Sequence, residues 1–214
     1  MIQACLPKRN DPVSISLKAK IPFKALEYRE ALIWRASELA STACRLLEEG
    51  ELAAGTLLVR GLMETSAALW FLNRKIKDVV DGHRVGSIDE DLMRLLMGSR
   101  TDLTTYESFN VLTLVDKIAQ EIPSFRREYE ALSQIAHPNW CGTMMLYSRP
   151  NTEKIWTDFG KHVRDNESVV KVGLINLNAG LQIFEYAYNQ IVDLMPRFIE
   201  ICEKALDDSV ESAR

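Results

Sequence analysis

Hydrophobic residues recur with helical spacing along most of this 214-residue chain. Residues 22–49 hold no internal helix breaker, and Pro22 suits a first helical turn. Apolar positions alternate at spacings of four and three along this segment: Leu32, Ala36, Leu39, Ala43 and Leu46. This pattern predicts an amphipathic helix that ends at Gly50 and has small residues on its inner face.

A second helix is predicted from about residue 51 to 81, so the first two helices form a hairpin around Gly50. Between Leu52 and Leu72 this helix is apolar nearly all round, which is typical of an element at the centre of a domain. The stretch is long enough to span a membrane, but Arg60 and Glu64 lie at its middle. We therefore interpret it as a core helix.

Shorter helices are predicted over residues 87–98, 111–121 and 124–136. Residues 144–160 have β-branched and aromatic residues on both sides of Pro150 and Asn151, which predicts a β-hairpin with its loop there. A last helix is predicted over 166–207, with a kink at Pro196. Its apolar residues keep a 3.5-residue spacing suited to packing along a bundle or against a second copy: Val170, Leu174, Leu177, Leu181, Phe184, Tyr188, Ile191 and Met195.

These elements predict an all-α fold, an antiparallel helical bundle with a small β-hairpin inserted before the long C-terminal helix. We expect an N-terminal arm over residues 1–21, in which 13–17 alternate as in an extended strand. A single bundle domain follows over residues 22–208, and a disordered tail over 209–214.

The composition and charge are those of a globular protein and exclude a disordered chain. The formal charge is -4, with 47% hydrophobic and 26% charged residues, which is typical of a globular domain. Residues 1–30 carry six basic and three acidic side chains, and residues 193–214 carry three basic and six acidic ones, so the two ends could dock on each other or on a second subunit. The N-terminus lacks the apolar stretch of a signal peptide, and we expect a cytoplasmic protein with reduced thiols.

Arg60 and Glu64 are the first candidate site, because they lie four residues apart on the most apolar helix. Partners at this spacing face each other, so one interpretation is a structural ion pair. The other is an internal polar pocket in which Arg60 binds an anion or phosphate and Glu64 orients it or acts as a base.

The second candidate site is the segment LSQIAHPNWCGT, with Ser133, His137 and Asn139. Pro138 disfavours helix at His137, which places the imidazole at a helix C-terminus, either as a structural group or as a site residue. Cys141 could act as a nucleophile with His137 as its base, or as a buried structural thiol. The sequence contains no phosphate-binding glycine loop, no nucleophile elbow and no metal-ligand spacing, so we expect no cofactor and no metal.

These two segments resemble a poorly characterised group of bacterial helical proteins that is compared with the HEPN-like bundles. The resemblance covers roughly residues 25–205 and rests on R-x-x-x-E (Arg60, Glu64), on S-x-x-x-H-P (Ser133, His137), and on the hairpin and long last helix that follow. It implies a helical bundle, often dimeric, and in HEPN proteins a metal-independent ribonuclease of toxin-antitoxin or phage-defence systems. Those nucleases carry Arg four to six residues before His on one helix, and this chain has no such pair.

Our principal expectation is therefore a cytoplasmic, homodimeric binding or regulatory module, with a protein or RNA as its possible further partner and no membrane association. The alternative is a HEPN-like ribonuclease with a composite site of Arg60, Glu64 and His137, in which His137 transfers protons and Arg60 stabilises phosphate charge. A third option is a small-molecule pocket around the same residues, walled by Trp70, Trp140 and Tyr147.

Overall fold

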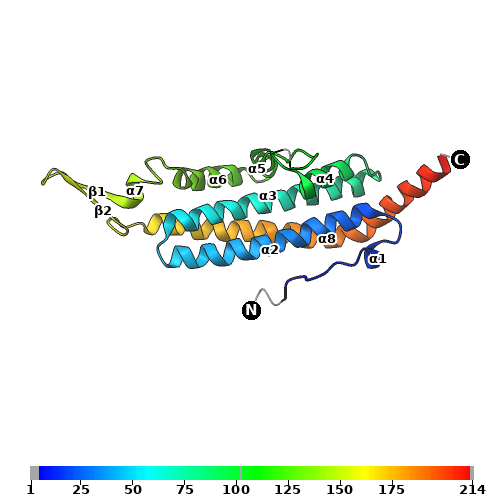
Figure 1. The fold of residues 1–214 in the computed structure, drawn as a ribbon, viewed down its shortest axis with the longest axis horizontal. Helices are drawn as coiled ribbons and strands as arrows, with labels where there is room; N and C mark the ends of the chain where they lie inside the picture. The colour runs from blue at the N-terminus through cyan, green and yellow to red at the C-terminus, as the bar shows by residue number, and fades with distance from the viewer. Residues whose placement is uncertain (1–4, 102, 213–214) are drawn as a thin grey trace.

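The computed structural model describes residues 5–101 and 103–212. Its elements follow the order α1 (Pro12–Ile15), α2 (Lys20–Glu48), α3 (Leu52–Gly82), α4 (Ile88–Met97), α5 (Val111–Ala119), α6 (Pro123–Ala136), α7 (Met144–Tyr147), β1 (Ser148–Asn151), β2 (Trp156–Phe159) and α8 (Glu167–Ser212). The prediction of an all-α bundle with a small hairpin before the last helix is confirmed. α2 runs antiparallel to α3, whereas α8 runs in the same direction as α3 (Figure 1).

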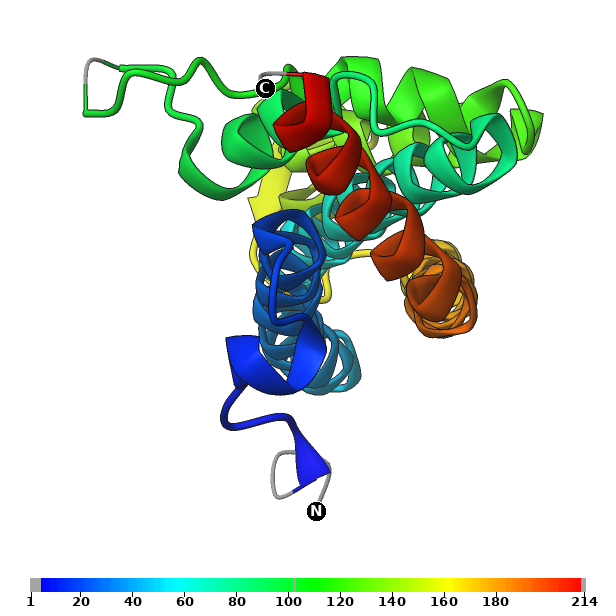
Figure 2. The same ribbon diagram turned by 90° about the vertical axis from the view of Figure 1, so that its right-hand side faces the viewer.

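Helix α3 lies at the centre of the bundle. Figure 2 shows α2 and α8 on one side of it and α4–α6 on the other. From Thr65 to Asn73 every residue of α3 is buried, which fits the absence of a polar face in this stretch. Each fully buried Leu or Phe contributes about 1.5–3 kcal/mol, so this helix supplies much of the burial that holds the fold together.

The turn between α2 and α3 closes at Gly50, as predicted. Gly50 has φ of 76°, in the left-handed region where a side chain is strained. A Cβ at this position would lie 2.6 Å from Cε1 of His162, so the turn also packs against the segment that precedes α8. Glycine is therefore required here both by the backbone and by the neighbouring ring.

The N-terminal arm forms a short helix where the alternation of residues 13–17 predicts extended backbone. Asp11 accepts a hydrogen bond from the backbone N–H of Val13 through its carboxylate, at 3.0 Å, and Pro12 occupies the first helical turn. This capping explains why the local structure is α1 rather than a strand.

The arm and the C-terminal part of α8 dock on each other, one of the two arrangements that the charge asymmetry indicates. Ser16 donates a hydrogen bond to Glu203 at 2.6 Å, and Lys18 pairs with Asp207 at 3.0 Å. The opposite charges of the two ends thus meet within one chain. Helix α8 continues to Ser212, where the sequence predicts a disordered tail from residue 209; residues 213–214 lie outside the described residues.

The β-hairpin differs from the prediction in where it turns. Pro150 and Asn151 belong to β1, which pairs antiparallel with β2 in the register Ser148↔Phe159 to Asn151↔Trp156, and the turn spans residues 152–155. Residues 144–147 form α7 instead of strand. The prediction placed the loop at Pro150 because proline is typical of turns, but proline is also tolerated in an edge strand, where the structure has it.

Pro196 lies inside α8, which continues through it and is not divided there, and the apolar seam of this helix is only partly covered. Phe184 and Ile191 are buried in the bundle, whereas Leu174 and Leu181 are each 39% exposed. In the described part of the chain, no helix combines the length and apolar character needed to cross a membrane.

A buried charged cluster holds α2 against α8. Arg29 donates a hydrogen bond from Nε to the backbone carbonyl of Tyr188 at 3.0 Å, its guanidinium lies 3.3 Å from the centre of the Tyr188 ring, and it also pairs with Glu30. The Tyr188 hydroxyl donates to Glu30 at 2.6 Å. We call Arg29, Glu30 and Tyr188 the Arg29 cluster; it satisfies charges that burial would otherwise penalise.

Candidate functional site

Arg60 and Glu64 form an ion pair on α3, with Nε of Arg60 3.2 Å from Oε1 of Glu64. Their side chains are 24% and 26% exposed, so the pair lies at the edge of the core and not inside it. It faces α6, because the remaining faces of α3 are covered by α2 and α8.

Tyr129 of α6 completes this pair. Its hydroxyl accepts a hydrogen bond from Nε of Arg60 at 3.1 Å and donates one to Oε1 of Glu64 at 2.8 Å. Burial raises the pKa of the Tyr129 hydroxyl and the hydrogen bond to Glu64 raises it further, while Arg60 acts in the opposite direction. The phenol therefore stays protonated, as its donation to Glu64 requires. We call these three residues the Arg60 cluster.

The other predicted site residues mainly hold local backbone. Ser133 donates its hydroxyl to the carbonyl of Tyr129 at 2.8 Å, one turn back along α6. Asn139 donates to the side chain of Gln134 at 2.8 Å and accepts from the backbone N–H of Gly142 at 3.1 Å, which shapes the turn after the helix.

His137 is the C-terminal cap residue of α6 and its side chain is exposed. It follows Tyr129 by eight residues, a rise of about 12 Å along a helix. Tyr129, and not His137, is thus the α6 residue that the fold brings to Arg60 and Glu64. Cys141 is half-buried and makes no hydrogen bond to His137 within the described residues.

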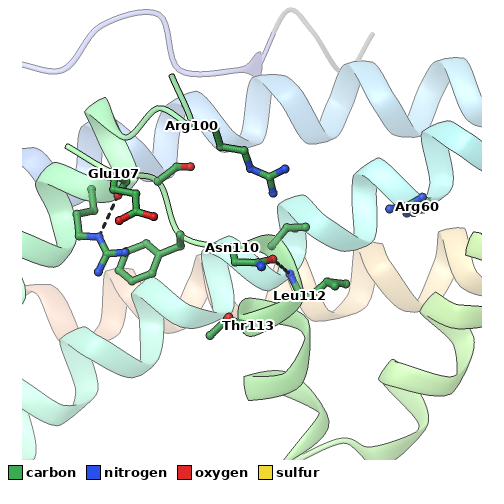
Figure 3. Close-up of a pocket in the computed structure, with 10 residues that line it drawn as sticks. Arg60, Arg100, Glu107, Asn110, Leu112 and Thr113 are labelled. Atoms are coloured by element: carbon green, nitrogen blue, oxygen red, sulfur yellow. Dashed lines mark hydrogen bonds between the residues drawn. The ribbon is translucent and has the colours of Figure 1, made fainter. Parts of the chain in front are cut away.

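A cavity of about 780 Å³ opens beside Arg60. Figure 3 shows Arg60 on α3, Arg100 on the segment after α4, and Asn110, Leu112 and Thr113 at the start of α5 around this space. The other lining residues are Arg94, Glu107, Ser108, Phe109 and Val111. Arg60 is the only residue of the predicted site that lines the cavity, and Trp70, Trp140 and Tyr147 do not line it.

The segment between α4 and α5 is folded so that it presents its arginine to this cavity. Ser99 donates its backbone N–H to Tyr106 at 2.9 Å, and Ser108 donates to Ser99 at 3.1 Å, which closes the loop. A Cβ at Gly98 would lie 2.1 Å from the carbonyl oxygen of Arg94 and 2.7 Å from Cα of Ser108. The close approach of these backbones therefore depends on glycine.

Charge around the cavity is positive on balance, since three arginines and Glu107 line it and Glu64 pairs with Arg60 beside it. Arg94 donates Nε to the carbonyl of Glu107 at 3.0 Å and lies 4.0 Å from the centre of the Phe109 ring. Arg60 uses Nε in its own cluster and lies 5.1 Å from the centre of the Tyr129 ring, while its terminal amino groups form no hydrogen bond among the described residues. Arg100 likewise has no hydrogen bond or ion pair in the described part of the chain.

The start of α5 adds oriented N–H groups to the same space. Asn110 caps this helix by accepting the backbone N–H of Leu112 at 3.0 Å through its side chain. The N-terminal end of a helix carries partial positive charge, which reinforces the arginines. The arrangement can hold an anion by several charge-assisted hydrogen bonds. Among residues 5–101 and 103–212 there is no group of three or more His, Cys, Asp or Glu that could hold a metal ion.

Sequence reasoning missed Tyr129, Arg94 and Arg100. Tyr129 could have been found, because it lies four residues before Ser133 on the same face of a correctly predicted helix. Arg94 and Arg100 could not, since a cavity that both of them line depends on the path of the loop between α4 and α5.

The chain matches no protein-family model, and neither a curated protein nor a solved structure matches it.

Proposed function

We propose that the protein is a cytoplasmic helical binding or regulatory module, and that its ligand is an anion carrying phosphate or carboxylate groups. The observation that supports this most directly is the cavity beside Arg60, which Arg94 and Arg100 also line together with one carboxylate, that of Glu107. Its volume of about 780 Å³ falls within the range of about 300–1,000 Å³ typical of small-molecule sites.

The Arg60 cluster gives this proposal a physical basis. Glu64 and Tyr129 both contact Nε of Arg60 and so fix the guanidinium, while its terminal amino groups keep their donors for a ligand. A donor that is held in place loses less conformational entropy when it binds. Glu64 thereby acts as a positioning residue.

Isothermal titration calorimetry with inorganic pyrophosphate tests the proposal. A charge-assisted hydrogen bond contributes about 1.5–3 kcal/mol, so Arg60→Gln and Arg100→Gln should each weaken binding about 10- to 100-fold. Arg127→Gln is a matched control, because Arg127 is 77% exposed on α6 and does not line the cavity. Absence of binding to the wild type, or an equal loss in the control, would contradict the proposal.

The ribonuclease alternative is supported less well by the geometry. It needs His137 beside Arg60 and Glu64, and the residue in that place is Tyr129. RNA cleavage in the presence of a chelator, compared between wild type and His137→Ala, tests it directly. Cleavage that disappears in His137→Ala would favour the nuclease, and an RNA that binds without being cleaved would favour the binding module.

We also propose that the module acts as a homodimer. The exposed parts of the α8 seam, at Leu174 and Leu181, leave room for further packing. The surface that we expect to form the contact between two copies is a different one, at the β1–β2 hairpin.

A further inference from the structure

The end of the molecule that carries the hairpin exposes an unusual amount of apolar surface. The β1–β2 ribbon projects beyond the helices (Figure 1). Six large apolar side chains here are more than a third exposed: Trp140 62%, Met144 44%, Tyr147 37%, Ile155 90%, Trp156 52% and Phe159 70%. We call these six residues the hairpin patch. Single exposed hydrophobic residues are ordinary, but a group of this kind marks an interaction surface.

The most exposed member is also held in an unfavourable conformation. Ile155 lies in the turn with φ of 58°, in the left-handed region that β-branched residues strongly avoid. Glycine or asparagine would suit this position better, and either would avoid placing an aliphatic side chain in water. A residue that is strained and exposed at once is expected where the side chain has a partner.

The two edges of the ribbon are not equivalent. β1 contains Pro150, which has no N–H to donate, and the carbonyl of Ser148 already accepts from Arg164 at 2.6 Å. β2 contains no proline, and its backbone pairs only with β1 among the described residues. An unprotected edge strand pairs readily with another strand, and a two-stranded ribbon alone is only marginally stable.

Charge on the ribbon indicates what kind of partner it takes. Residues 148–159 carry Arg149, Glu153, Lys154 and Asp158, two charges of each sign, and none of them forms an ion pair in the described part of the chain. Lys154 lies 4.9 Å from the centre of the Trp156 ring. A nucleic acid or an acidic surface would favour one sign of charge, whereas alternating signs suit a partner with the same pattern.

We propose that β2 pairs with β2 of a second copy of this chain, which gives a four-stranded antiparallel sheet across a two-fold axis. A two-fold contact is isologous, so the same strand serves in both protomers and must run antiparallel to itself. With the axis at Thr157, Ile155 of one protomer lies opposite Phe159 of its partner and Trp156 lies opposite Asp158, so that Lys154 at the turn is the diagonal neighbour of this Asp158.

Part of the exposed apolar area at this end of the molecule lies on the pairing strand. At roughly 200 Å² for a large side chain, the hairpin patch presents about 700 Å² of apolar surface. A stable interface of standard size buries about 800 Å² on each partner. Because alternate residues of a strand point to opposite faces, Trp156 and Phe159 lie on opposite faces of the ribbon, and pairing along β2 covers the part of this area that β2 carries while adding strand hydrogen bonds. This inference is independent of the anion cavity, which lies beside Arg60 on α3.

Light scattering on the full-length chain tests the proposal. The wild type should have twice the chain mass of 24.3 kDa at micromolar and higher concentrations. Trp156→Asp and Phe159→Asp should each weaken dimerisation at least tenfold. Leu17→Asp is the matched control, because Leu17 is 83% exposed on the N-terminal arm and should leave the dimer unchanged.

Ile155→Gly separates an interface role from a merely structural one. Glycine adopts a φ of 58° without strain, so the variant should be at least as resistant to urea as the wild type while its dimer weakens. A monomeric wild type would overturn the proposal, and so would a dimer that all three hairpin variants leave intact. Oxidation of Thr157→Cys should give a covalent dimer, whereas Asp158→Cys should not, since only the pair at the axis has disulfide geometry; the reverse result would refute this register.

Discussion

Replacing Tyr129 by phenylalanine tests whether its hydroxyl holds the Arg60 cluster together. The substitution removes one oxygen atom, and with it the hydrogen bond from Arg60 at 3.1 Å and the one to Glu64 at 2.8 Å. The ring itself stays, and because Tyr129 is only 2% exposed its packing should be preserved. The change in the free energy of unfolding should therefore measure what the Tyr129 hydroxyl contributes.

The expected cost can be derived from the geometry. A hydrogen bond to a charged group contributes about 1.5–3 kcal/mol. Arg60 and Glu64 remain in contact at 3.2 Å and are about a quarter exposed, so water can replace part of what is lost. We expect Tyr129→Phe to lower the free energy of unfolding by about 1–2 kcal/mol. At a urea m-value of about 3 kcal/mol/M, the unfolding midpoint should fall by about 0.5 M with no change in m.

Tyr188→Phe is the matched comparison, because the Arg29 cluster has the same three residue types in a drier setting. The side chains of Arg29 and Glu30 are 7% and 14% exposed, so Tyr188→Phe leaves a charge that water reaches poorly. We expect it to cost more, about 2–3 kcal/mol. If Tyr188→Phe lowers the free energy of unfolding by no more than Tyr129→Phe does, the argument from burial is refuted. Tyr129→Phe should also weaken pyrophosphate binding several-fold through the freed Arg60, whereas Tyr188→Phe should not.

Two further predictions concern pH and the glycines of α8. Burial, together with the hydrogen bond to Glu30, raises the pKa of Tyr188 from 10.0 to about 12, so the folded state holds this proton more tightly. The stabilisation should be complete below pH 10 and be lost as pH rises towards 12, and urea midpoints across this window should fall less steeply in Tyr188→Phe. Gly180→Ala should raise the melting temperature through a gain of about 0.5–1 kcal/mol, because its Cβ would meet Leu62 at an ordinary 3.5 Å. Gly173→Ala should lose that gain, since its Cβ would lie 2.9 Å from Leu47, and equal melting shifts in the two variants would contradict this explanation.

The long helices could be predicted because the spacing of their apolar residues shows which of their faces are buried. The segment from Leu52 to Leu72 is apolar nearly all round, and in the structure α3 packs against α2, α8 and α4–α6 and is buried at every residue from Thr65 to Asn73. Gly50 was expected to mark a helix end because of its position, and it directly follows Glu49, the C-terminal cap residue of α2. Periodicity reports which face is buried, and for long elements this decides the fold.

Features that depend on long-range packing were not predictable in the same way. Pro150 is compatible with a turn and with an edge strand, and only the pairing with Thr157 decides between them. The cavity depends on where the loop after Gly98 returns, and no spacing in the sequence encodes that path. Arg60 was identified because a charge in an apolar helix is conspicuous, whereas Arg100 lies in a polar loop where arginine is ordinary.

The two Arg–Glu–Tyr clusters together show why the site is sought at Arg60. In the Arg29 cluster the arginine contacts a carboxylate, a backbone carbonyl and an aromatic face, and it is 6% exposed. Its charge is thus largely satisfied within the fold. Arg60 forms hydrogen bonds only through Nε in the described chain, its guanidinium lies 5.1 Å from the centre of the Tyr129 ring, and it borders a cavity that two more arginines line. A purely structural ion pair has no need of unused donors beside an open space, so the difference between the clusters favours a ligand at Arg60 over a structural role alone.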